Sequence, residues 1–353
     1  MKTNYYISSP FKKAWKKKIL LWYSVHKRKL PWRERENQNF YKVWLSEVML
    51  QQTTVKTVIP YYQKFIEKWP NIESFFNAEL NEILIMWQGL GYYQRANNLF
   101  KAKEFLKKNS LKISSKELKK LPGIGDYISC SISAILNDEQ CAVVDGNIKR
   151  ILSRVFSLKK TEVNFNKTVK MIAQELTPKE DNKFYCQSLM DLANLICKAR
   201  NPLCNSCPIN NFCQTNGKVI KTNKKPAIPK KVGVTILLKF KDKMAVSVSN
   251  KKMFQGLFQL PLTEYEEYFD DNEVIKIKLS LLKKWAKAFK KDLKFEDLGL
   301  IHHKFSHFHL KLFVVEIVLN REKKLENFFW MTTKEFEKKP ISNLMQKVNK
   351  FIK

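Results

Sequence analysis

The sequence lacks any apolar run near the length of a membrane span. A helix that crosses a bilayer needs about 20 consecutive apolar residues, and no stretch of the 353 residues approaches this length. No secretory signal is evident, because the basic segment 12–30 instead carries Trp15, Ile19, Trp22 and Tyr23 at helical spacing. We therefore expect a cytoplasmic protein without a membrane partner, with a core-packed helix near its N-terminus.

Acidic residues are about half as frequent as basic ones. The chain has 33 aspartate and glutamate residues against 65 lysine and arginine residues, which gives a formal net charge of +32. Such a charge indicates a polyanionic partner, most simply nucleic acid. The lysines are spread over the whole chain, which a genome biased toward lysine codons would also produce. Charge alone therefore supports a nucleic-acid partner only in part.

Internal repeats are also absent, and the hydrophobic period changes near residue 216. Apolar residues from residue 40 onward recur at i, i+4, which indicates helices. The following lysine-rich stretch contains Pro226 and Pro229 and is typical of a linker. After it, apolar residues alternate with period two, as in β-strands, and the last element is an amphipathic helix. We predict a mainly α domain over 1–216, a linker over 217–231 and a smaller α+β domain over 232–353.

Cysteine is scarce, and its seven copies are unevenly placed. Four of them crowd into 17 positions with the spacing C-x6-C-x2-C-x5-C, namely Cys197, Cys204, Cys207 and Cys213. This clustering in a cytosolic chain argues for metal rather than disulfides. Four thiolates on one loop suit the irons of a cubane cluster, whereas zinc more typically uses two separated C-x2-C pairs. The other three, Cys130, Cys141 and Cys186, are expected in the core.

A glycine turn lies upstream of this cluster. Gly123 and Gly125 flank one apolar residue, and an apolar helical run begins at Tyr127. This pattern exposes backbone N–H groups at a helix N-terminus, where a phosphate can bind. Asp145 follows 20 residues after Gly125. From the residues alone, it is either an N-cap for the helix that begins near Asn147 or a catalytic carboxylate.

Together the cysteine loop, the glycine turn and Asp145 resemble the endonuclease III/MutY superfamily of DNA glycosylases. The resemblance implies a helix-hairpin-helix glycosylase fold, which is a six-helix barrel plus an Fe–S helical domain, and a 4Fe-4S cluster in the 197–213 loop. It also implies that Gly123, Gly125 and Asn147 contact DNA. Asp145 would face the deoxyribose and stabilise an oxocarbenium-like transition state or attack it covalently.

Two positions beside the glycine turn depart from the superfamily pattern. Bifunctional members carry a lysine where this chain has Tyr127, and a tyrosine cannot form their Schiff base. We therefore expect hydrolysis without strand cleavage. Asp126 stands where a neutral or basic residue is expected beside a phosphate, and it would cap the following helix.

A single carboxyl lies in the apolar segment 41–53. Glu47 in these surroundings should have a raised pKa, which suits a general acid at neutral pH. The more common alternative for a lone glutamate is a surface position on an amphipathic helix. The segment, with Pro31-Trp32 upstream, is very similar to the MutY signature, which implies that Glu47 is the catalytic acid. Trp32 and Arg33 would then border the adenine pocket, and Tyr127 would hydrogen-bond in it.

Base flipping requires groups that replace the extruded adenine in the duplex. Gln52 and Tyr92 match the family's wedge positions. The neighbouring Tyr93 is the better candidate for a core aromatic. Relatives often have arginine in the run that follows, where this chain keeps Arg95 but has Asn97, so one phosphate contact is expected to be lost.

In the C-terminal part, Phe305-Ser306-His307 resembles the loop with which MutY C-terminal domains recognise 8-oxoguanine. Oxidation turns guanine N7 from acceptor to donor, so the Ser306 hydroxyl can distinguish the two bases as an acceptor. The alternating histidines around this loop lack acidic or cysteine partners for a metal site. The domain looks Nudix-like, but no glutamate-rich Nudix signature is present, so we expect binding without nucleotide hydrolysis.

These expectations combine into one predicted function. The chain is expected to be a monomeric, monofunctional adenine DNA glycosylase acting on A:8-oxoG or A:G mispairs in double-stranded DNA. A bifunctional pyrimidine-lesion glycosylase is disfavoured by Tyr127 and Glu47. A mismatch or redox sensor derived from a decayed glycosylase should have lost Glu47 or Asp145, and both are present.

Overall fold

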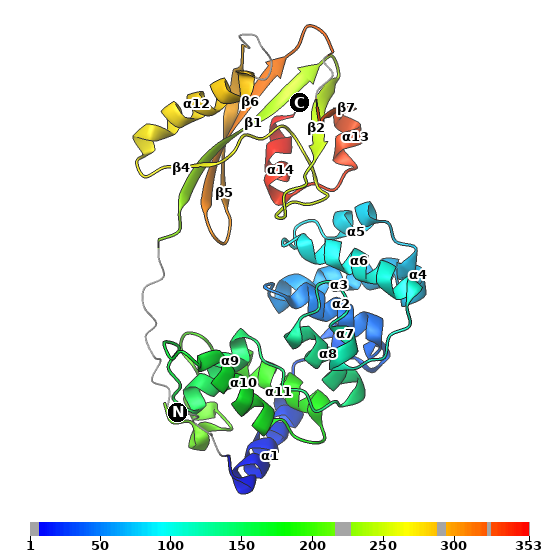
Figure 1. The fold of residues 1–353 in the computed structure, drawn as a ribbon, viewed down its shortest axis with the longest axis vertical. Coiled ribbons are helices and arrows are strands. Elements are labelled where there is room, and N and C mark those ends of the chain that lie inside the picture. Colours follow the sequence, from blue (N-terminus) through cyan, green and yellow to red (C-terminus); the bar gives the residue numbers. More distant parts are fainter. Residues whose placement is uncertain (1–6, 216–226, 288–293, 323–325, 353) are drawn as a thin grey trace. The chain divides into compact units, whose positions relative to one another are not determined.

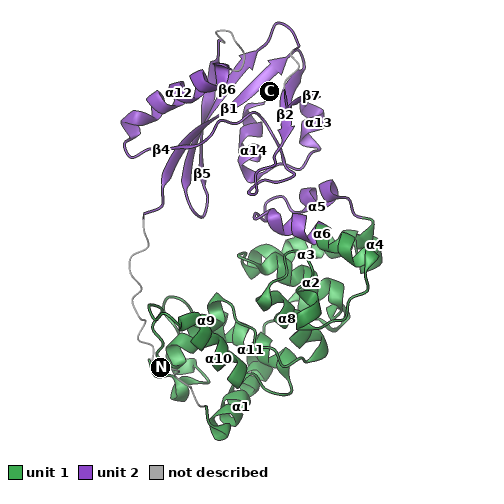
Figure 2. Ribbon diagram, in the orientation of Figure 1, with its two compact units in different colours: residues 1–77, 101–222 green, residues 78–100, 223–353 purple. Residues whose placement is uncertain are grey.

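The computed structural model describes residues 7–215, 227–287, 294–322 and 326–352. Two compact units, shown in Figures 1 and 2, are formed by residues 1–77 with 101–222 (unit 1) and by residues 78–100 with 223–353 (unit 2). Most of the predicted linker 217–231 lies outside the described residues. Segment 78–100 groups with the C-terminal residues, although the sequence pattern places it in the helical domain. The predicted domain boundaries themselves stay a prediction.

Unit 1 is helical, as the i, i+4 pattern predicts. Its helices are α1 (Ser9–His26), α2 (Phe40–Leu50), α3 (Val55–Lys68), α4 (Ile72–Phe76), α7 (Ser115–Leu118), α8 (Asp126–Asn137), α9 (Gly146–Val155), α10 (Phe165–Leu176) and α11 (Asn182–Leu195), and α6 (Gln94–Lys108) runs from unit 2 into it. Side-chain oxygens of Ser8, Asn39 and Thr54 cap α1, α2 and α3. None of the described helices has the length and apolar character that a membrane crossing requires.

The N-terminal helix α1 is packed in the core. Trp15, Ile19, Trp22 and Tyr23 are all buried against α9, α10 and α11, as their helical spacing predicts. The indole N–H of Trp15 donates to the hydroxyl of Tyr185 over 2.9 Å. The lysines of this helix remain on its outer side. The basic segment therefore forms a core-packed helix, as predicted.

Helix α8 occupies the centre of unit 1. It packs on α2 on one side and on α11 on the other. Residues 128–134 of α8 are all buried, and α2 is buried at residues 41 and 43–49. A helix that is apolar nearly all round belongs in the interior. The α2–α8 contact therefore brings any polar side chain on these two helices into a low-dielectric setting.

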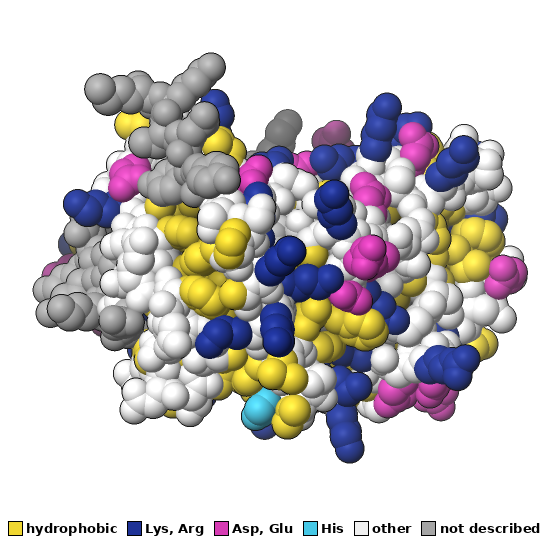
Figure 3. All heavy atoms as spheres, turned by 90° about the horizontal axis from the view of Figure 1, so that it is seen from below, with side chains coloured by type: hydrophobic (Ala, Val, Ile, Leu, Met, Phe, Trp, Pro, Cys, Tyr) yellow, Lys and Arg dark blue, Asp and Glu magenta, His cyan; other side chains and the backbone are white. Residues whose placement is uncertain are grey.

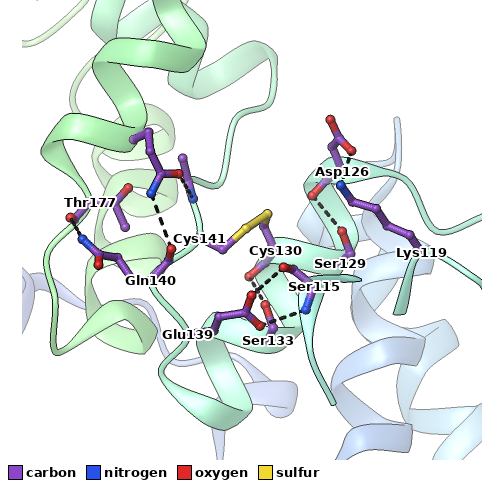
Figure 4. Close-up of a disulfide and its surroundings, with 12 residues drawn as sticks. Ser115, Lys119, Asp126, Ser129, Cys130, Ser133, Glu139, Gln140, Cys141 and Thr177 are labelled. Carbon is purple, nitrogen blue, oxygen red and sulfur yellow. Dashed lines mark hydrogen bonds and ion pairs between the residues drawn. A yellow bond between two sulfur atoms is a disulfide. The ribbon is translucent and has the colours of Figure 1, made fainter. Parts of the chain in front are cut away.

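The predicted core position is confirmed for Cys130 and wrong for Cys141, and the disulfide between them was not predicted. Cys130 is buried in α8, but it forms a disulfide with the half-buried Cys141, and the two Cα atoms lie 5.3 Å apart (Figure 4). The chain reverses after α8, with Asp138 in the left-handed region, and this turn returns Cys141 to the helix. The sequence around Cys141 does not indicate that this turn brings it next to Cys130. Cys186 is a buried free thiol, as predicted.

Unit 2 contains a mixed β-sheet. Its strands are β1 (Lys230–Phe240), β2 (Lys243–Val248), β3 (Phe258–Gln259), β4 (Glu266–Glu267), β5 (Glu296–Lys304), β6 (His309–Val318) and β7 (Phe329–Thr332). The order is β3-β2-β1-β6-β5, with β4 on β1 and β7 on β2, and β1 runs parallel to β6. The helices of unit 2 are α5 (Leu80–Met86), α12 (Val274–Ala286), α13 (Thr333–Glu337) and α14 (Asn343–Val348).

Both faces of this sheet are covered, which confirms the predicted α+β domain. Val234 and Ile236 of β1 belong to the core beneath α12, whereas Leu237 and Met244 belong to the core that includes Leu344 of α14. The period-two alternation of β1 therefore divides its side chains between two cores. The likeness of this domain to Nudix proteins stays a prediction.

Replacing Trp15 tests the assignment of α1 to the core. We expect Trp15→Ala to lower the free energy of unfolding by about 3–5 kcal/mol, because a fully buried indole is removed. Leu21→Ala on the same helix is the control, since Leu21 is exposed and should change stability by less than about 0.5 kcal/mol. Urea unfolding of both variants measures this. Equal effects would contradict the packing of α1.

Candidate active site

Glu47 lies on α2 where that helix faces α8. Its side chain is buried, with the residue only 8% exposed. Burial raises the pKa of Glu47 to about 7, although hydrogen bonds from Ser131 and Tyr127 and the charge of Arg33 act in the opposite direction. Among the described residues, its Oε2 atom has no hydrogen-bond partner within normal distance. Glu47 is therefore a buried acid, as the apolar segment around it predicts, and not a surface glutamate.

Two hydroxyl groups of α8 face this carboxyl. Tyr127 and Ser131 are one helical turn apart and both lower the pKa of Glu47 by hydrogen bonding. Burial raises the pKa of Tyr127 well above its usual value, and the charges of Glu47 and Asp145 raise it further. The phenol therefore stays neutral and donates. Ser131 escaped the sequence reasoning, although its i, i+4 spacing from Tyr127 was a usable signal.

Asp145 is both an N-cap and a member of the site. Its Oδ1 accepts from the backbone N–H groups of Asn147 and Ile148, each at 2.8 Å, at the start of α9. Its charge raises the pKa values of Glu47 and Tyr127, so the three groups share one electrostatic environment. The cap and catalytic alternatives are thus compatible. The cap fixes the position of the carboxylate, and its catalytic role stays a prediction.

A chain of hydrogen bonds runs from Asp145 to the cysteine loop. The side-chain amide of Asn147 donates to Asp145 Oδ2 over 2.8 Å. Arg150 donates to Asn147 Oδ1 at 3.0 Å and, through Nε, to the carbonyl of Cys197 at 2.9 Å. Asn147, predicted to bind DNA, here also orients the acidic residue. The cysteine loop is therefore positioned by the same helix that Asp145 caps.

The four clustered cysteines are free thiols that lie close enough to interact electrostatically. Cys207 has its pKa raised to about 11 by burial, with the other three cysteines contributing in the same direction. The described residues hold no group of three ligands arranged around a single ion. A cubane instead spreads its four thiolates over four irons. Arg154 donates to Cys197 Sγ over 3.3 Å, which suits a sulfur that carries negative charge.

Arg33 is anchored by a buried carboxylate. Asp191 of α11 has no exposed surface, and its two oxygens accept from Arg33 at 2.7 and 3.0 Å. Arg28 donates to the same carboxylate at 2.6 Å. Burial alone would raise the pKa of Asp191, but the bond to Arg33 holds it below its ordinary value. Sequence reasoning missed Asp191, which no local pattern marks.

The structure places Arg33, but not Trp32, in electrostatic contact with Glu47. Trp32 is buried and lies edge-on against Tyr62, with ring centroids 5.5 Å apart. The charge of Arg33 lowers the pKa of Glu47. The predicted role of both residues beside adenine stays a prediction.

The glycine turn has the conformation that its sequence predicts. Gly123 has a φ of +83°, in the left-handed region. Gly125 is the N-cap of α8, and a Cβ added there would meet no atom within 4 Å, so a ligand has room to approach. Asp126 forms ion pairs with Lys119 and Lys170, at 2.6 and 2.9 Å, and these lysines lower its pKa to about 2. Figure 4 shows the pair with Lys119.

Both predicted wedge residues have a left-handed backbone. Gln52, just after α2, has a φ of +55°, and Tyr92, just before α6, has a φ of +49°. Both side chains are exposed, whereas Tyr93 is buried, as predicted. Non-glycine residues in this region cost free energy and gather at functional sites. The two residues belong to different units.

The predicted reader residues occupy the hairpin between β5 and β6. Ser306 and His307 are exposed at its tip. Phe305 is half-buried and packs against Phe308 and His303, with ring centroids 4.6 and 4.4 Å apart. The aromatic ring therefore fixes the hairpin, while the side chains of Ser306 and His307 are exposed and lie within hydrogen-bonding distance of each other, with Oγ and Nδ1 3.4 Å apart.

Figure 3 shows how charged side chains are distributed on one face of the protein. The face in Figure 3 shows lysine and arginine groups interspersed with acidic and apolar ones and no continuous basic stripe. This distribution agrees with a net charge that derives partly from general lysine enrichment. The charge on this face therefore does not mark a DNA-binding surface.

Comparison with known proteins defines the class. Residues 45–179 match the model of the HhH-GPD superfamily of base excision DNA repair proteins, and residues 197–213 match the iron-sulfur binding domain of endonuclease III. A thermostable thymine-DNA glycosylase superposes with a TM-score of 0.53 at 26% identity, over 58% of this chain and 96% of that one. The endonuclease III of an endonuclease III–DNA complex shares the fold at 19% sequence identity. The TM-score is 0.51, and the match covers 60% of this chain and 97% of that one. The chain is a DNA N-glycosylase with an iron–sulfur loop, and its ligand is DNA.

Relatives that are similar in sequence show which family of DNA glycosylases the chain belongs to. Adenine DNA glycosylases of Buchnera aphidicola are 34% identical over 88% of this chain and 89% of theirs (subsp. Schizaphis graminum), and 36% identical over 86% of both (subsp. Baizongia pistaciae). The human adenine DNA glycosylase is 34% identical over 58% of this chain and 40% of its own length. The chain belongs to the adenine DNA glycosylase family.

The iron–sulfur cofactor makes a direct test possible. Cys197, Cys204, Cys207 and Cys213 would hold a 4Fe-4S cluster, which gives the loop a fixed shape. We expect Cys207→Ser to lower the iron content of the purified protein, since one of four ligands is lost. Cys186→Ser, at a free thiol outside the loop, is the matched control and should retain full iron. Iron loss in the Cys186 variant but not in the Cys207 variant would contradict this ligand set.

Proposed function

We propose that the protein is a monofunctional glycosylase that removes adenine mispaired with 8-oxoguanine or guanine in double-stranded DNA. The observation that carries this proposal is the buried Glu47, whose pKa of about 7 matches neutral conditions, in the same electrostatic environment as Asp145. Cleavage of an N-glycosidic bond needs an acid for the departing base and an anion for the sugar. The site offers one of each.

Glu47 would protonate a ring nitrogen of adenine. The anion of adenine is a poor leaving group, so protonation lowers the barrier to bond cleavage. A general acid is most effective when its pKa lies near the working pH. The hydroxyls of Tyr127 and Ser131 would hold the carboxyl in place while it donates. The charge of Arg33, compensated by Asp191, would limit how far the pKa of Glu47 rises.

Asp145 would face the sugar as positive charge develops there. Its orientation is fixed by three N–H donors, two from the backbone of α9 and one from Asn147. It can act through its charge or through a transient bond to the sugar. Tyr127 occupies the position of the Schiff-base lysine, so water completes the reaction and the DNA strand stays intact.

Gln52 and Tyr92 would open the duplex. Each is exposed and has a strained left-handed backbone, which suits a rigid group that is pushed between bases. Gly123 and Gly125 would hold a phosphate at the N-terminus of α8. In the C-terminal part, Ser306 would accept a hydrogen bond from N7–H of 8-oxoguanine, flanked by Phe305 and His307. The C-terminal domain would thus read the base opposite adenine.

Substitution of Glu47 tests the proposed acid. We expect Glu47→Gln to reduce the single-turnover rate of adenine release by at least about 100-fold, because general acid catalysis typically contributes 10²–10⁴-fold. Binding of an A:8-oxoG duplex should change little. The measurement is a glycosylase assay with and without alkali, since a strand cut that requires alkali also shows monofunctional action.

The free energy of unfolding is the control for this variant. It should not fall below that of the wild type at pH 8, because Glu47→Gln removes a carboxylate whose ionisation is opposed by burial. A variant that loses binding and stability together would have a folding defect. Normal adenine release by a stably folded variant would refute the role of Glu47.

Substitution of Ser306 tests the proposed reader. We expect Ser306→Ala to reduce the preference for adenine opposite 8-oxoguanine over adenine opposite guanine by about fivefold, the effect of one hydrogen bond. Single-turnover rates on the two duplexes measure it. Ser342→Ala, at a buried serine that caps α14, controls for general destabilisation of the domain. An unchanged preference in the Ser306 variant would refute this contact.

A further inference from the structure

Asn97 does not face solvent, although the sequence pattern suggests a lost phosphate contact there. It is 5% exposed, on α6 in unit 2. Its Nδ2 donates to the carbonyl of Tyr93 at 3.1 Å and to the carbonyl of Gln255 at 2.9 Å. Both amide hydrogens are therefore used. The second bond joins residues that are 158 positions apart in the sequence.

The Gln255 carbonyl is presented by a tight turn of the C-terminal domain. Gly256 has a φ of +84°, and its N–H donates to the carbonyl of Ser249 at 2.9 Å, which closes the turn. A Cβ at Gly256 would meet Leu84 of α5 at 3.1 Å and Asn97 at 3.6 Å. The turn therefore packs closely against α5 and α6, and a side chain at Gly256 would press on Leu84. A second bond, from the Gln88 amide to the Lys339 carbonyl at 3.2 Å, joins segment 78–100 to a different part of the C-terminal residues, just after α13.

This turn also touches the proposed reader hairpin. The ring of Phe254 packs on Phe305 with centroids 6.0 Å apart and the planes tilted by 57°. Phe305 in turn packs on Phe308 at the other side of the hairpin tip. On the helical side, the Tyr93 carbonyl that Asn97 also binds follows directly after Tyr92. A continuous path of contacts therefore joins the Tyr92 turn to the Ser306 hairpin within unit 2, the purple body of Figure 2.

We propose that Asn97 is a specificity-determining positioning residue, which docks the C-terminal domain on the helix that follows Tyr92. The bond from Asn97 to Gln255 sets the distance between Tyr92 and the Ser306 hairpin within unit 2, so that both act on the same guanine-side nucleotide. This inference rests on the proposed function, because it assigns Asn97 to the discrimination between 8-oxoguanine and guanine. In this proposal Asn97 acts by positioning the turn, through its bonds to the Tyr93 and Gln255 carbonyls, and not by contact with the reacting atoms.

Asn97→Ala in the full-length protein tests the proposal. The substitution removes both hydrogen bonds of the Asn97 side-chain amide and adds no charge. Asn98→Ala is the matched control on the same helix, because the Asn98 side chain accepts a hydrogen bond from Gln94, at 3.0 Å, within α6. We expect Asn97→Ala to reduce the preference for 8-oxoguanine over guanine about fivefold, the effect of one hydrogen bond. The rate on the A:G duplex should stay within twofold. Phe254→Ala, at the other end of the path, should reduce the same preference.

A structural measurement accompanies the kinetics. Deuterium uptake of residues 249–257 in the DNA-free protein should rise in Asn97→Ala and stay unchanged in Asn98→Ala. A variant with raised uptake and an intact preference would overturn the proposal. So would an equal fall of the rates on both duplexes, because that would show damage to the helix itself. If the wild type shows no preference between the duplexes, the proposed substrate fails, and if it releases no adenine, the proposed function fails.

Discussion

The burial of one carboxyl group between α2 and α8 is the constraint on which the site depends. Glu47 lies on α2, a helix that is apolar on nearly all sides. The hydroxyls of Tyr127 and Ser131, on α8, form hydrogen bonds with its carboxyl group. Transfer of a carboxylate into such a setting is costly, so the group keeps its proton to a higher pH. The packing that stabilises unit 1 therefore also produces the acid that the proposed reaction needs.

The remaining polar groups of the site serve folding and chemistry together. Asp145 caps α9 and faces the same environment as Glu47. Asp191 forms ion pairs with two half-buried guanidinium groups, of which that of Arg33 lowers the pKa of Glu47. Arg150 connects Asn147 to the cysteine loop. A buried polar network of this kind fixes a single arrangement when its members are paired. The iron–sulfur loop is part of this hydrogen-bonded network through Arg150, and we assign no step of the hydrolysis to it.

Sequence reasoning could predict those features that local pattern encodes. The helical spacing of Trp15 and Ile19 indicates α1, and the alternation of Val234 and Ile236 indicates β1. The apolar run around Glu47 indicates its raised pKa, and the glycine spacing indicates the turn at Gly123. Each of these depends on neighbours within one or two turns of the chain.

Contacts between distant segments could not be predicted in this way. Asp191 meets Arg33 across 158 positions, and Asn97 meets Gln255 across the same separation. The Cys130–Cys141 disulfide depends on a left-handed turn at Asp138. The close spacing of the four clustered cysteines favoured metal binding over disulfides, and it gave no information on Cys130 and Cys141. The sequence suggested a lost phosphate contact at Asn97 because relatives often have arginine in this run, and only the tertiary structure shows that Asn97 is buried against the Gln255 turn.

A direct titration of Glu47 tests the central claim. Carbon-13 NMR of glutamate carboxyls in the DNA-free protein, with Glu47→Gln to assign the resonance, reports the protonation of this one group. Burial between α2 and α8 predicts a midpoint at a pH of about 7. A midpoint near 4.5, the ordinary value for glutamate, would show that the carboxyl is solvated and ionised at neutral pH, and the proposed acid would not exist.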